Sequence, residues 1–498
     1  MKFPLLVVAS RRFTHCLILL TQWGLTSCDK HEKAENASIQ VVSITKVPHL
    51  PDVKSMSYPD AVAVFEGTIL SEESVVFATW IVTNRVKLPH YRLKPGDTVE
   101  IKSNGILSDA PLMVRQAQRF DDTSNFELPV LWSPEVEIRS QSGKLAETAG
   151  AKMPADNVLK QTASGGAGDS WAEKIASLAP YRAKMKSVIA GLPSISPEGK
   201  TEAQIAMLKP TLIGEKGRLN EWWAEVYTDY ITKVDSVEPW SGQTAVRPAI
   251  LTAKKWLEAR GVRLVFVMIP VSSEVYPDVF FPQETPPDRI VAPHVRKLAA
   301  DIQADGVTVV DLLPQMLKAR SEDDGELLYW PLDPHWAPRG MKVAAKSIAA
   351  VLDASLRRTD SPFVQVDAPL PEGWFGAGGD SVDATVKAVA AAAAPKVLQK
   401  TVTRDGLPPQ DVNAKSPVVL IGDSYCFASP VPEANFRAQL VHELGSPVHM
   451  ISTGGDTVHA FREFMRNPTL LEEVKTVVWI SVGVSLAGAD RWDVSWLK

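Results

Sequence analysis

The sequence contains few cysteines. Only Cys16, Cys28 and Cys426 occur among its 498 residues, and the first two fall in an N-terminal stretch with the features of an export signal. Removal of that stretch, with lipidation of Cys28, would leave Cys426 alone in the folded region, so no intramolecular disulfide could form there. The fold must therefore rest on its hydrophobic core, although the compartment of an exported protein permits disulfides.

The chain also lacks a strong charge of either sign and a long apolar run. Its formal net charge is −5, and without a long basic run it offers no electrostatic footprint for nucleic acid. The N-terminal apolar run covers residues 13–25, which is shorter than the roughly 20 residues that span a bilayer. A composition of 45% hydrophobic and 22% charged residues is that of an ordinary globular protein. The length predicts two domains or more.

The N-terminus has the layout of a secretory signal. Lys2, Arg11 and Arg12 precede the apolar run, which ends in the small residues of "LTSC". This ending resembles a bacterial lipoprotein signal, in which Cys28 would carry the lipid. The alternative is a plain signal peptide with an incidental cysteine. We expect residues 1–28 to be a lipoprotein-like signal peptide, residues 29–45 to be a tether, and the protein to be lipid-anchored in the periplasm or cell envelope.

Residues 46–139 contain short β-rich runs separated by turn residues, among them "AVAVFEG", "SVVFATWIV" and "LPVLW". The turn residues Pro95-Gly96-Asp97 followed by the alternating "TVEIK" predict a turn that leads into a strand. We expect a small β-barrel or sandwich here, as an N-terminal β-rich domain. Residues 140–235 are interpreted as a linker, with segments such as "SGGAGDS", followed by a helical region.

Residues 236–498 show a different pattern, in which almost wholly apolar runs alternate with helical stretches. The runs are "RLVFVMIP", "GVTVVDL", "PVVLIGDS", "PVHMIST" and "TVVWISVG". Such runs are typical of strands buried on both faces of a parallel sheet. We therefore predict an α/β fold, with a three-layer α/β/α domain built on a parallel sheet. An insertion at about residues 362–412 interrupts this domain.

Three polar residues have the chemistry of an active site. Ser424 follows the apolar run "PVVLI", and the carboxyl edge of a parallel sheet is where such folds bind ligands. A serine hydroxyl needs a positioned base to act as a nucleophile, and His335 is the best base in the chain. Asp333 is spaced so that its carboxylate, in a tight turn, accepts from the imidazole and fixes its tautomer. Pro338 favours a helix start that would hold this turn.

This combination resembles the SGNH (GDSL-like) hydrolase superfamily. The order of "DPHW" before "GDSY" is similar to the permuted branch that contains the alginate O-acetyltransferases. Matching segments include "GVRLVFVMIPVSSEVYPD", "LLYWPLDPHWAPRGMKVAA", "VVLIGDSY" and "STGGDTVHAF", within about 255–352 and 416–485. The resemblance implies an SGNH hydrolase-like catalytic domain at residues 236–498.

Position by position, the resemblance implies that Ser424 is the nucleophile, His335 the general base and Asp333 its orienting partner. The backbone N–H of Ser424 and that of Gly454 or Gly455 would form the oxyanion hole, because glycine lets the backbone approach the developing charge closely. We expect no cofactor and no metal.

The chain departs from the family in three places. Ser272-Ser273 stand where a lysine is expected after "IP", the run "VVWISVG" lacks the acidic and arginine residues that often follow it, and there is no "GxND" block. These departures concern substrate contacts more than the triad. Candidate substrate-binding residues near the triad are Trp330, Trp336, Tyr425 and Arg462.

Each feature has an alternative interpretation. Ser424 can simply cap the next helix. Asp333 and His335 can be metal ligands, although no further cluster in the sequence has ligand spacing. The aromatic residues can be core residues instead of sugar platforms, and a solvated helix face explains Arg462 as well.

The resemblance favours an O-acetyltransferase that modifies an exported polysaccharide, with a membrane-bound O-acyltransferase as the partner that supplies acetyl groups. The N-terminal β-rich domain would hold the glycan or dock onto that partner. A carbohydrate esterase would use the same triad, with water in place of the sugar. A non-catalytic glycan-binding scaffold lipoprotein is the third interpretation.

We expect Cys28 to be the lipidated mature N-terminus, because the apolar run ends in "LTSC". Mass spectrometry of the protein purified from membranes should find a diacylglyceryl group on this residue, and Cys28→Ala should release the protein from the membrane. A water-soluble mature protein that starts well beyond residue 28 would contradict the anchor.

Overall fold

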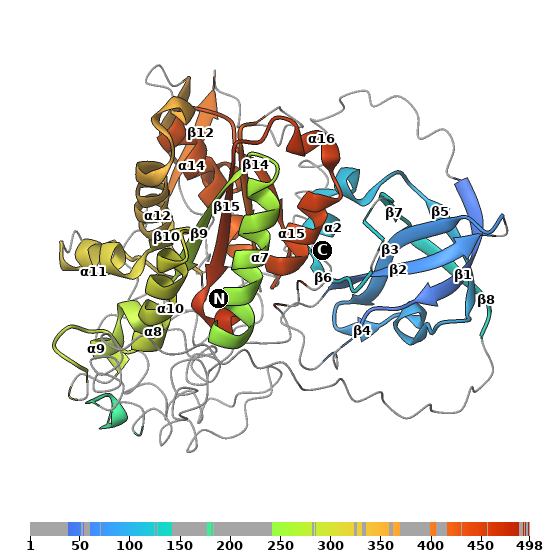
Figure 1. Cartoon of the computed structure of the whole chain (residues 1–498), viewed down its shortest axis with the longest axis horizontal. Coiled ribbons are helices and arrows are strands. Elements are labelled where there is room, and N and C mark those ends of the chain that lie inside the picture. Colours follow the sequence, from blue (N-terminus) through green and yellow to red (C-terminus); the bar gives the residue numbers. More distant parts are fainter. Residues whose placement is uncertain are drawn as a thin grey trace, which may run out of the picture.

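The computed structural model (Figure 1) describes two large parts of the chain. These are residues 38–141, apart from 51–52, 54–59, 70, 124 and 127, and residues 242–487, apart from 281–282, 284, 323–325, 331–334, 358–361, 369–398, 405–415, 430 and 456. Residues 177–180, 183, 492, 494 and 497 are also described. The expected signal peptide with Cys28, the residue Asp333 and nearly all of the expected linker and helical region lie outside the described residues.

The C-terminal part is built on a five-stranded sheet in the order β10-β9-β15-β13-β14. Every neighbouring pair is parallel, which confirms the predicted parallel sheet. The two central strands are buried along their whole length, and this explains why their sequences are almost wholly apolar. The strands are β9 (Arg263–Ile269), β10 (Thr308–Asp311), β13 (Val418–Gly422), β14 (His449–Ser452) and β15 (Thr476–Val482).

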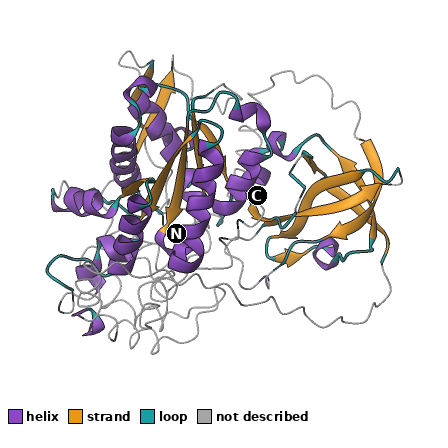
Figure 2. Ribbon diagram, viewed as in Figure 1, coloured by secondary structure: helices purple, strands orange, loops and turns teal. Residues whose placement is uncertain are grey.

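Helices pack around this sheet, as Figure 2 shows in purple. Six of them carry proline in the first turn, where its missing N–H removes no helical hydrogen bond. Helix α14 begins at Phe436, where Asn435 caps it by accepting from the Ala438 N–H at 2.9 Å. The helices are α7 (Arg247–Glu258), α8 (Ser272–Val275), α9 (Pro277–Phe280), α10 (Pro293–Ala304), α11 (Leu313–Ser321), α12 (Pro338–Val351), α14 (Phe436–Leu444), α15 (Thr457–Met465) and α16 (Pro468–Leu471).

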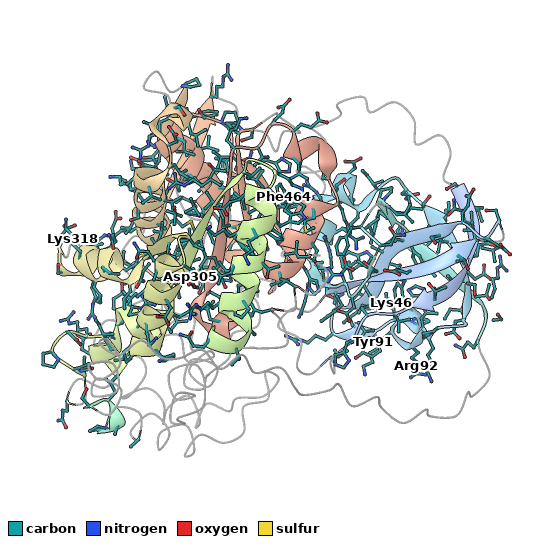
Figure 3. All side chains as sticks on the ribbon, in the orientation of Figure 1. Lys46, Tyr91, Arg92, Asp305, Lys318 and Phe464 are labelled. Carbon is teal, nitrogen blue, oxygen red and sulfur yellow. The ribbon has the colours of Figure 1, made fainter. Side chains whose placement is uncertain are left out.

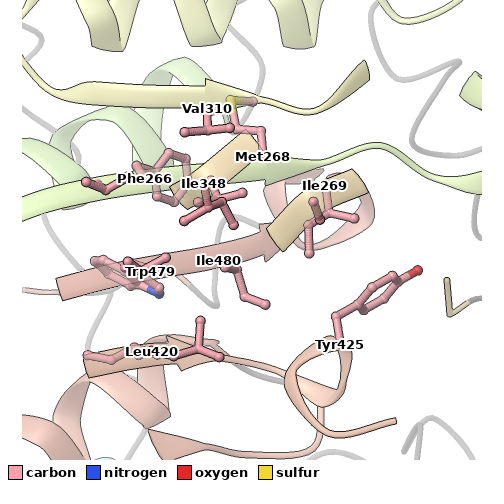
Figure 4. Close-up of a cluster of buried hydrophobic side chains, with 14 of the residues drawn as sticks. Phe266, Met268, Ile269, Val310, Ile348, Leu420, Tyr425, Trp479 and Ile480 are labelled. Carbon is pink, nitrogen blue, oxygen red and sulfur yellow. The ribbon is translucent and has the colours of Figure 1, made fainter. Parts of the chain in front are cut away.

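Aromatic side chains join the helices to the sheet. Trp479 on β15 stacks on Phe461 of α15 with ring centroids 4.5 Å apart, and Phe266 on β9 meets Trp479 edge-on at 6.2 Å. Figure 4 shows Phe266, Trp479 and Leu420 within the same buried cluster. Side chains fill the interior, and Asp305, labelled in Figure 3, accepts from Arg247 at 2.6 and 2.9 Å, which ties the end of α10 to the start of α7.

Residues 38–140 form a second sheet of eight strands, which we call the N-terminal sheet unit. Its main path is β4-β3-β2-β1-β5-β8, with β6 paired to β2 and β7 to β3. It has its own buried clusters around Phe65 and Phe77, which stack at 5.4 Å, and around Trp132. Its elements are β1 (Ser38–Lys46), β2 (Ala61–Ile69), β3 (Ser74–Thr83), β4 (Val86–Lys87), β5 (Thr98–Ser103), α2 (Leu112–Gln116), β6 (Gln118–Phe120), β7 (Val130–Trp132) and β8 (Glu135–Ser140).

Strand β1 corrects the expected tether at residues 29–45. It pairs with β2 on one side and β5 on the other, so it lies inside the sheet in spite of its polar residues. Val42 and Ile44 are buried. The proposed insertion also contains structure, because β11 (Phe363–Ala368) and β12 (Gln399–Arg404) pair as a two-stranded antiparallel sheet.

Among the described residues, no helix combines the length and hydrophobicity needed to traverse a lipid bilayer.

The N-terminal sheet unit buries a carboxylate against the C-terminal part. Asp121 is 5% exposed, and its Oδ atoms lie 3.3 Å from Arg466 Nη2 and 3.8 Å from Arg462 Nη2. Burial alone would raise the pKa of Asp121, but the positive charges of Arg466 and Arg462 outweigh burial and lower this pKa below its ordinary value. The ionised carboxylate is therefore the form that stabilises the contact.

We expect Asp121→Asn to lower the free energy of unfolding by about 3 kcal/mol at pH 7, because it leaves two buried guanidinium groups without their counter-charge. Since the pKa is lowered in the folded state, the contribution is present above the unfolded pKa of about 3.9 and is lost as the pH falls through the folded value. Urea unfolding at pH 7, 4.5 and 3 checks this.

The matched control is Glu100→Gln, which removes the charge that Arg139, on the edge strand β8, contacts at 2.7 Å. We expect it to change the unfolding free energy by no more than about 1 kcal/mol. Equal effects of the two substitutions at pH 7 would contradict a buried charge contact at Asp121.

Candidate active site

Ser424 lies just beyond the carboxyl end of β13. It is the first residue of a short 3₁₀ helix, η8 (Ser424–Cys426). Ser424 is only 7% exposed. Asp423 caps this turn, since its carboxylate accepts from the Tyr425 N–H at 3.0 Å. The cap is therefore Asp423, and the interpretation of Ser424 as a helix cap does not hold.

The Ser424 hydroxyl meets His335 instead. His335 Nε2 lies 2.7 Å from Ser424 Oγ, and the imidazole is 7% exposed. Eighty-nine residues separate the two in sequence, and the parallel sheet brings them together at its carboxyl edge. A histidine at this distance can take the hydroxyl proton as the oxygen attacks an electrophile. Asp333, the expected third member, lies outside the described residues and stays a prediction.

A short hairpin positions His335. Tyr329 and Trp336 form an isolated antiparallel bridge, and the Trp330 N–H donates to the His335 carbonyl oxygen at 3.1 Å. The hydroxyl of Tyr329 donates to the carbonyl oxygen of Pro270, at the end of β9. The hairpin is thus fixed to the sheet edge before α12 begins.

Gly340, in the first turn of α12, lets the helix approach this hairpin closely. A Cβ atom at this position would lie 2.2 Å from the Leu328 carbonyl oxygen and 3.0 Å from Trp336 Cβ. Backbone cannot move away from such a contact as a flexible side chain would. The close packing of α12 therefore helps to set the position of His335.

The aromatic residues proposed for substrate binding are core residues in this structure. Trp336 is fully buried, and its Nε1 donates to the Tyr425 carbonyl oxygen at 3.1 Å. Trp330 is 4% exposed and packs against Leu327 and Ala337. Rings buried to this extent present no face on which a sugar can stack. This corrects the substrate-binding predictions for Trp330 and Trp336.

Tyr425 is also buried, at 3% exposure, and the same correction applies to it. Its ring lies beside the imidazole of His335, with centroids 4.8 Å apart, and meets Trp336 edge-on at 5.3 Å. Tyr425, the residue directly after Ser424, thus packs against one side of the His335 imidazole.

Arg462 is corrected as well. It is 6% exposed, donates to the carbonyl oxygen of Thr123 and lies over the Phe126 ring at 5.1 Å. These partners belong to the N-terminal sheet unit, so Arg462 serves the contact between the two parts of the chain.

The two glycines expected near the oxyanion have different surroundings. The Gly454 N–H donates to the Ala117 carbonyl oxygen at 3.4 Å, so the structure gives it a partner other than an oxyanion. Gly455 has φ of +74°, a left-handed conformation that glycine adopts without steric cost. The oxyanion role of Ser424 and Gly455 stays a prediction.

Cys426 is the other nucleophilic group near Ser424. Burial raises the pKa of its thiol well above the ordinary value, and the nearby Asp423 carboxylate raises it further. The neutral thiol is a poor nucleophile. In the described part of the chain, no three His, Cys, Asp or Glu side chains come together as metal ligands.

Comparison with known proteins identifies a family and a curated relative. A family profile described as "SGNH hydrolase-like domain, acetyltransferase AlgX" matches residues 227–480, more than half of the chain. A curated protein, the probable alginate O-acetylase AlgJ of Pseudomonas fluorescens, is 28% identical over 204 residues, which are 39% of this chain and 48% of AlgJ. The chain thus spans about half the length of this curated relative.

Two solved structures are similar at lower identity. The O-acetyltransferase domain of Pseudomonas putida AlgJ is 21% identical with a TM-score of 0.40, over 54% of this chain and 92% of that domain. Pseudomonas aeruginosa AlgX is 19% identical with a TM-score of 0.36, over 51% of this chain and 58% of that protein.

We expect Gly340→Ala to lower the free energy of unfolding by about 1–3 kcal/mol, because the added methyl group must displace the Leu328 backbone or shift α12. Urea unfolding followed by tryptophan fluorescence measures this. Ser347→Ala, later in the same helix, removes only a hydroxyl that bonds the Val343 carbonyl oxygen and should cost about 0.5 kcal/mol. A Gly340→Ala protein as stable as this control would show that the contact is not tight.

Proposed function

The chain belongs to the AlgX family of SGNH hydrolase-like acetyltransferases, and on this basis we propose that it acetylates an exported polysaccharide in the cell envelope. The observation that carries the proposal is the 2.7 Å contact between His335 Nε2 and Ser424 Oγ. A serine paired with a base is what acyl transfer through a covalent intermediate requires. The similar protein AlgJ is described as a probable alginate O-acetylase, which supports a polysaccharide acceptor.

The reaction has two halves. In the first, His335 takes the Ser424 proton as Oγ attacks the acetyl carbonyl carbon of the donor, and the imidazolium returns that proton to the donor's leaving group. In the second, His335 takes the proton of a sugar hydroxyl, which attacks the acetyl-serine and releases Ser424 with its proton restored. Asp333 would orient the imidazole, and the N–H groups of Ser424 and Gly455 would stabilise the tetrahedral oxyanion.

The cellular setting is part of the proposal. Lipidated Cys28 would hold the chain at the membrane, where a membrane-bound O-acyltransferase would supply acetyl groups. Residues 236–498 would form the three-layer α/β/α catalytic domain, and the N-terminal sheet unit would be the β-rich domain that precedes it. Strands β13 and β15 are buried along their whole length and so need cover on both faces, which supports the three-layer arrangement.

We expect Ser424→Ala to abolish acetyl transfer from an activated acetyl ester to an oligosaccharide acceptor, and to abolish covalent labelling by a fluorophosphonate. His335→Ala should slow both reactions by about 100-fold or more, because it removes the general base. Asp333→Asn should reduce transfer severely while the fold survives. Mass spectrometry of the labelled peptide and of the acetylated sugar measures these effects.

The matched control is Ser429→Ala, five residues after the proposed nucleophile. This substitution removes a hydroxyl that donates to the Val431 carbonyl oxygen. It should keep full activity. Free acetate without acetylated sugar would identify an esterase that uses the same residues. Full transfer by Ser424→Ala would rule out the serine mechanism and leave the scaffold interpretation.

A further inference from the structure

The N-terminal sheet unit contacts the turn beside the proposed nucleophile. Gln118 of β6 and Gly454 form an isolated parallel bridge, and the Gly454 N–H donates to the Ala117 carbonyl oxygen at 3.4 Å. On its other side, the Thr453 N–H donates to the Gly422 carbonyl oxygen, at the end of β13, at 3.2 Å. The turn is therefore held between the nucleophile strand and the N-terminal sheet unit.

The sheet register places this turn level with Ser424. Gly422 on β13 is paired with Ser452 on β14. Ser424 comes two residues after Gly422, and Gly454 comes two residues after Ser452. Both therefore lie at the same edge of the sheet and the same distance past the last paired residues. Any displacement of the turn would change the surroundings of the serine hydroxyl.

Helix α15 follows the turn and has two occupied faces. Phe461 and Phe464 face the core, and Thr457 Oγ1 donates to the Ile480 carbonyl oxygen at 2.9 Å. The other face is a polar stripe at the spacing i, i+3, i+4, i+7, which one side of a helix presents to a neighbour. The stripe consists of His459, Arg462 and Glu463 on the helix and Arg466 one residue past its end, and all four contact residues 119–126.

The segment that faces this stripe, residues 119–123, places every second side chain toward α15, as an extended chain does. Arg119, Asp121 and Thr123 alternate along it, and alternate residues of an extended chain share a face. Arg119 is paired with Glu463, their side chains being 2% and 19% exposed. Thr123 Oγ1 accepts from Arg466, and its carbonyl oxygen accepts from Arg462.

Aromatic and histidine contacts complete this interface. Phe126 lies 5.1 and 5.0 Å from the guanidinium carbons of Arg462 and Arg466. His459 Nε2 lies 3.1 Å from the Asp121 carbonyl oxygen and 3.3 Å from the Asp121 backbone nitrogen. We call the contacts of residues 117–126 with Gly454 and α15 the clamp. Figure 1 shows α2, β6 and α15 where the two parts meet.

We propose that the clamp positions the Gly454–Gly455 turn against Ser424, so that the N-terminal sheet unit is a positioning element of acyl transfer. Arg119, Asp121 and Glu463 are positioning residues in this arrangement, because they act through the turn and α15. The inference rests on the proposed function of Ser424. It assigns the N-terminal sheet unit a role in the rate of the reaction, distinct from holding the glycan or docking onto a partner.

The test uses the full chain with Glu463→Gln and Asp121→Asn, which remove a charge and keep the size of the side chain. We expect each to lower kcat for acetyl transfer, and the rate of Ser424 labelling by a fluorophosphonate, by about tenfold or more while KM changes less than about twofold, since small misplacements of reacting groups are costly. Glu463→Asp keeps the carboxylate and should recover part of the loss. Glu100→Gln, whose Arg139 ion pair is remote from the clamp, should match the unaltered protein.

The outcomes separate the two proposals. Unchanged kcat and labelling rate in folded Glu463→Gln would overturn the positioning role, and so would an equal loss in Glu100→Gln. If the Asp121→Asn protein does not fold, the Glu463→Gln protein still tests the positioning role, because Glu463 is partly exposed and its substitution is less disruptive. A rise in KM with kcat unchanged would also overturn it, since that result assigns the clamp to substrate binding. Failure of the unaltered protein to label or transfer would instead refute the proposed function.

Discussion

The register of β13 between β15 and β14 is the constraint on which the rest of the structure depends. Parallel pairing on both sides aligns the carboxyl ends of these strands, so Ser424 and the Gly454 turn leave the sheet together. At the end of β13, a Cβ on Gly422 would lie 2.4 Å from Ile480 Cγ1 and 2.7 Å from Cys426 Sγ. The absence of a side chain there lets the strand turn sharply into the serine while both neighbours remain packed.

Two further layers of contacts meet at this edge. The Tyr329–Trp336 hairpin brings His335 from one side, and α15 with the N-terminal sheet unit holds the glycine turn from the other. The first layer is mostly apolar and backbone-bonded, whereas the second buries charged groups in pairs. Buried ion pairs contribute little net stability compared with apolar packing, but they tolerate few alternative geometries. The second layer is therefore suited to fixing one orientation of α15.

The sequence predicts the local features of this arrangement well. Apolar runs identify the parallel strands, and "GDS" and "DPHW" identify Ser424 and His335, because each signal lies within a few residues. It predicts less well where tertiary contacts decide. Trp336 near a site can be a platform or a core residue, and the full burial of its indole settles this. The polar sequence of β1 predicts a tether. It is instead a strand, because it pairs with β2 on one side and β5 on the other. Arg462 has a partner more than 300 residues away, although its place in an i, i+3, i+4, i+7 stripe is visible in the sequence.

The clamp also determines the order in which the chain can complete its fold. The contact between Arg466 and Asp121 joins residues 345 positions apart. In a chain that emerges from its N-terminus, the strands of the eight-stranded sheet are available before α15, so Asp121 lacks its cationic partners until α15 has been made. Contacts between distant segments close slowly because they carry a large loop entropy. The serine edge therefore acquires its final geometry as a late event in folding, after both sheets exist.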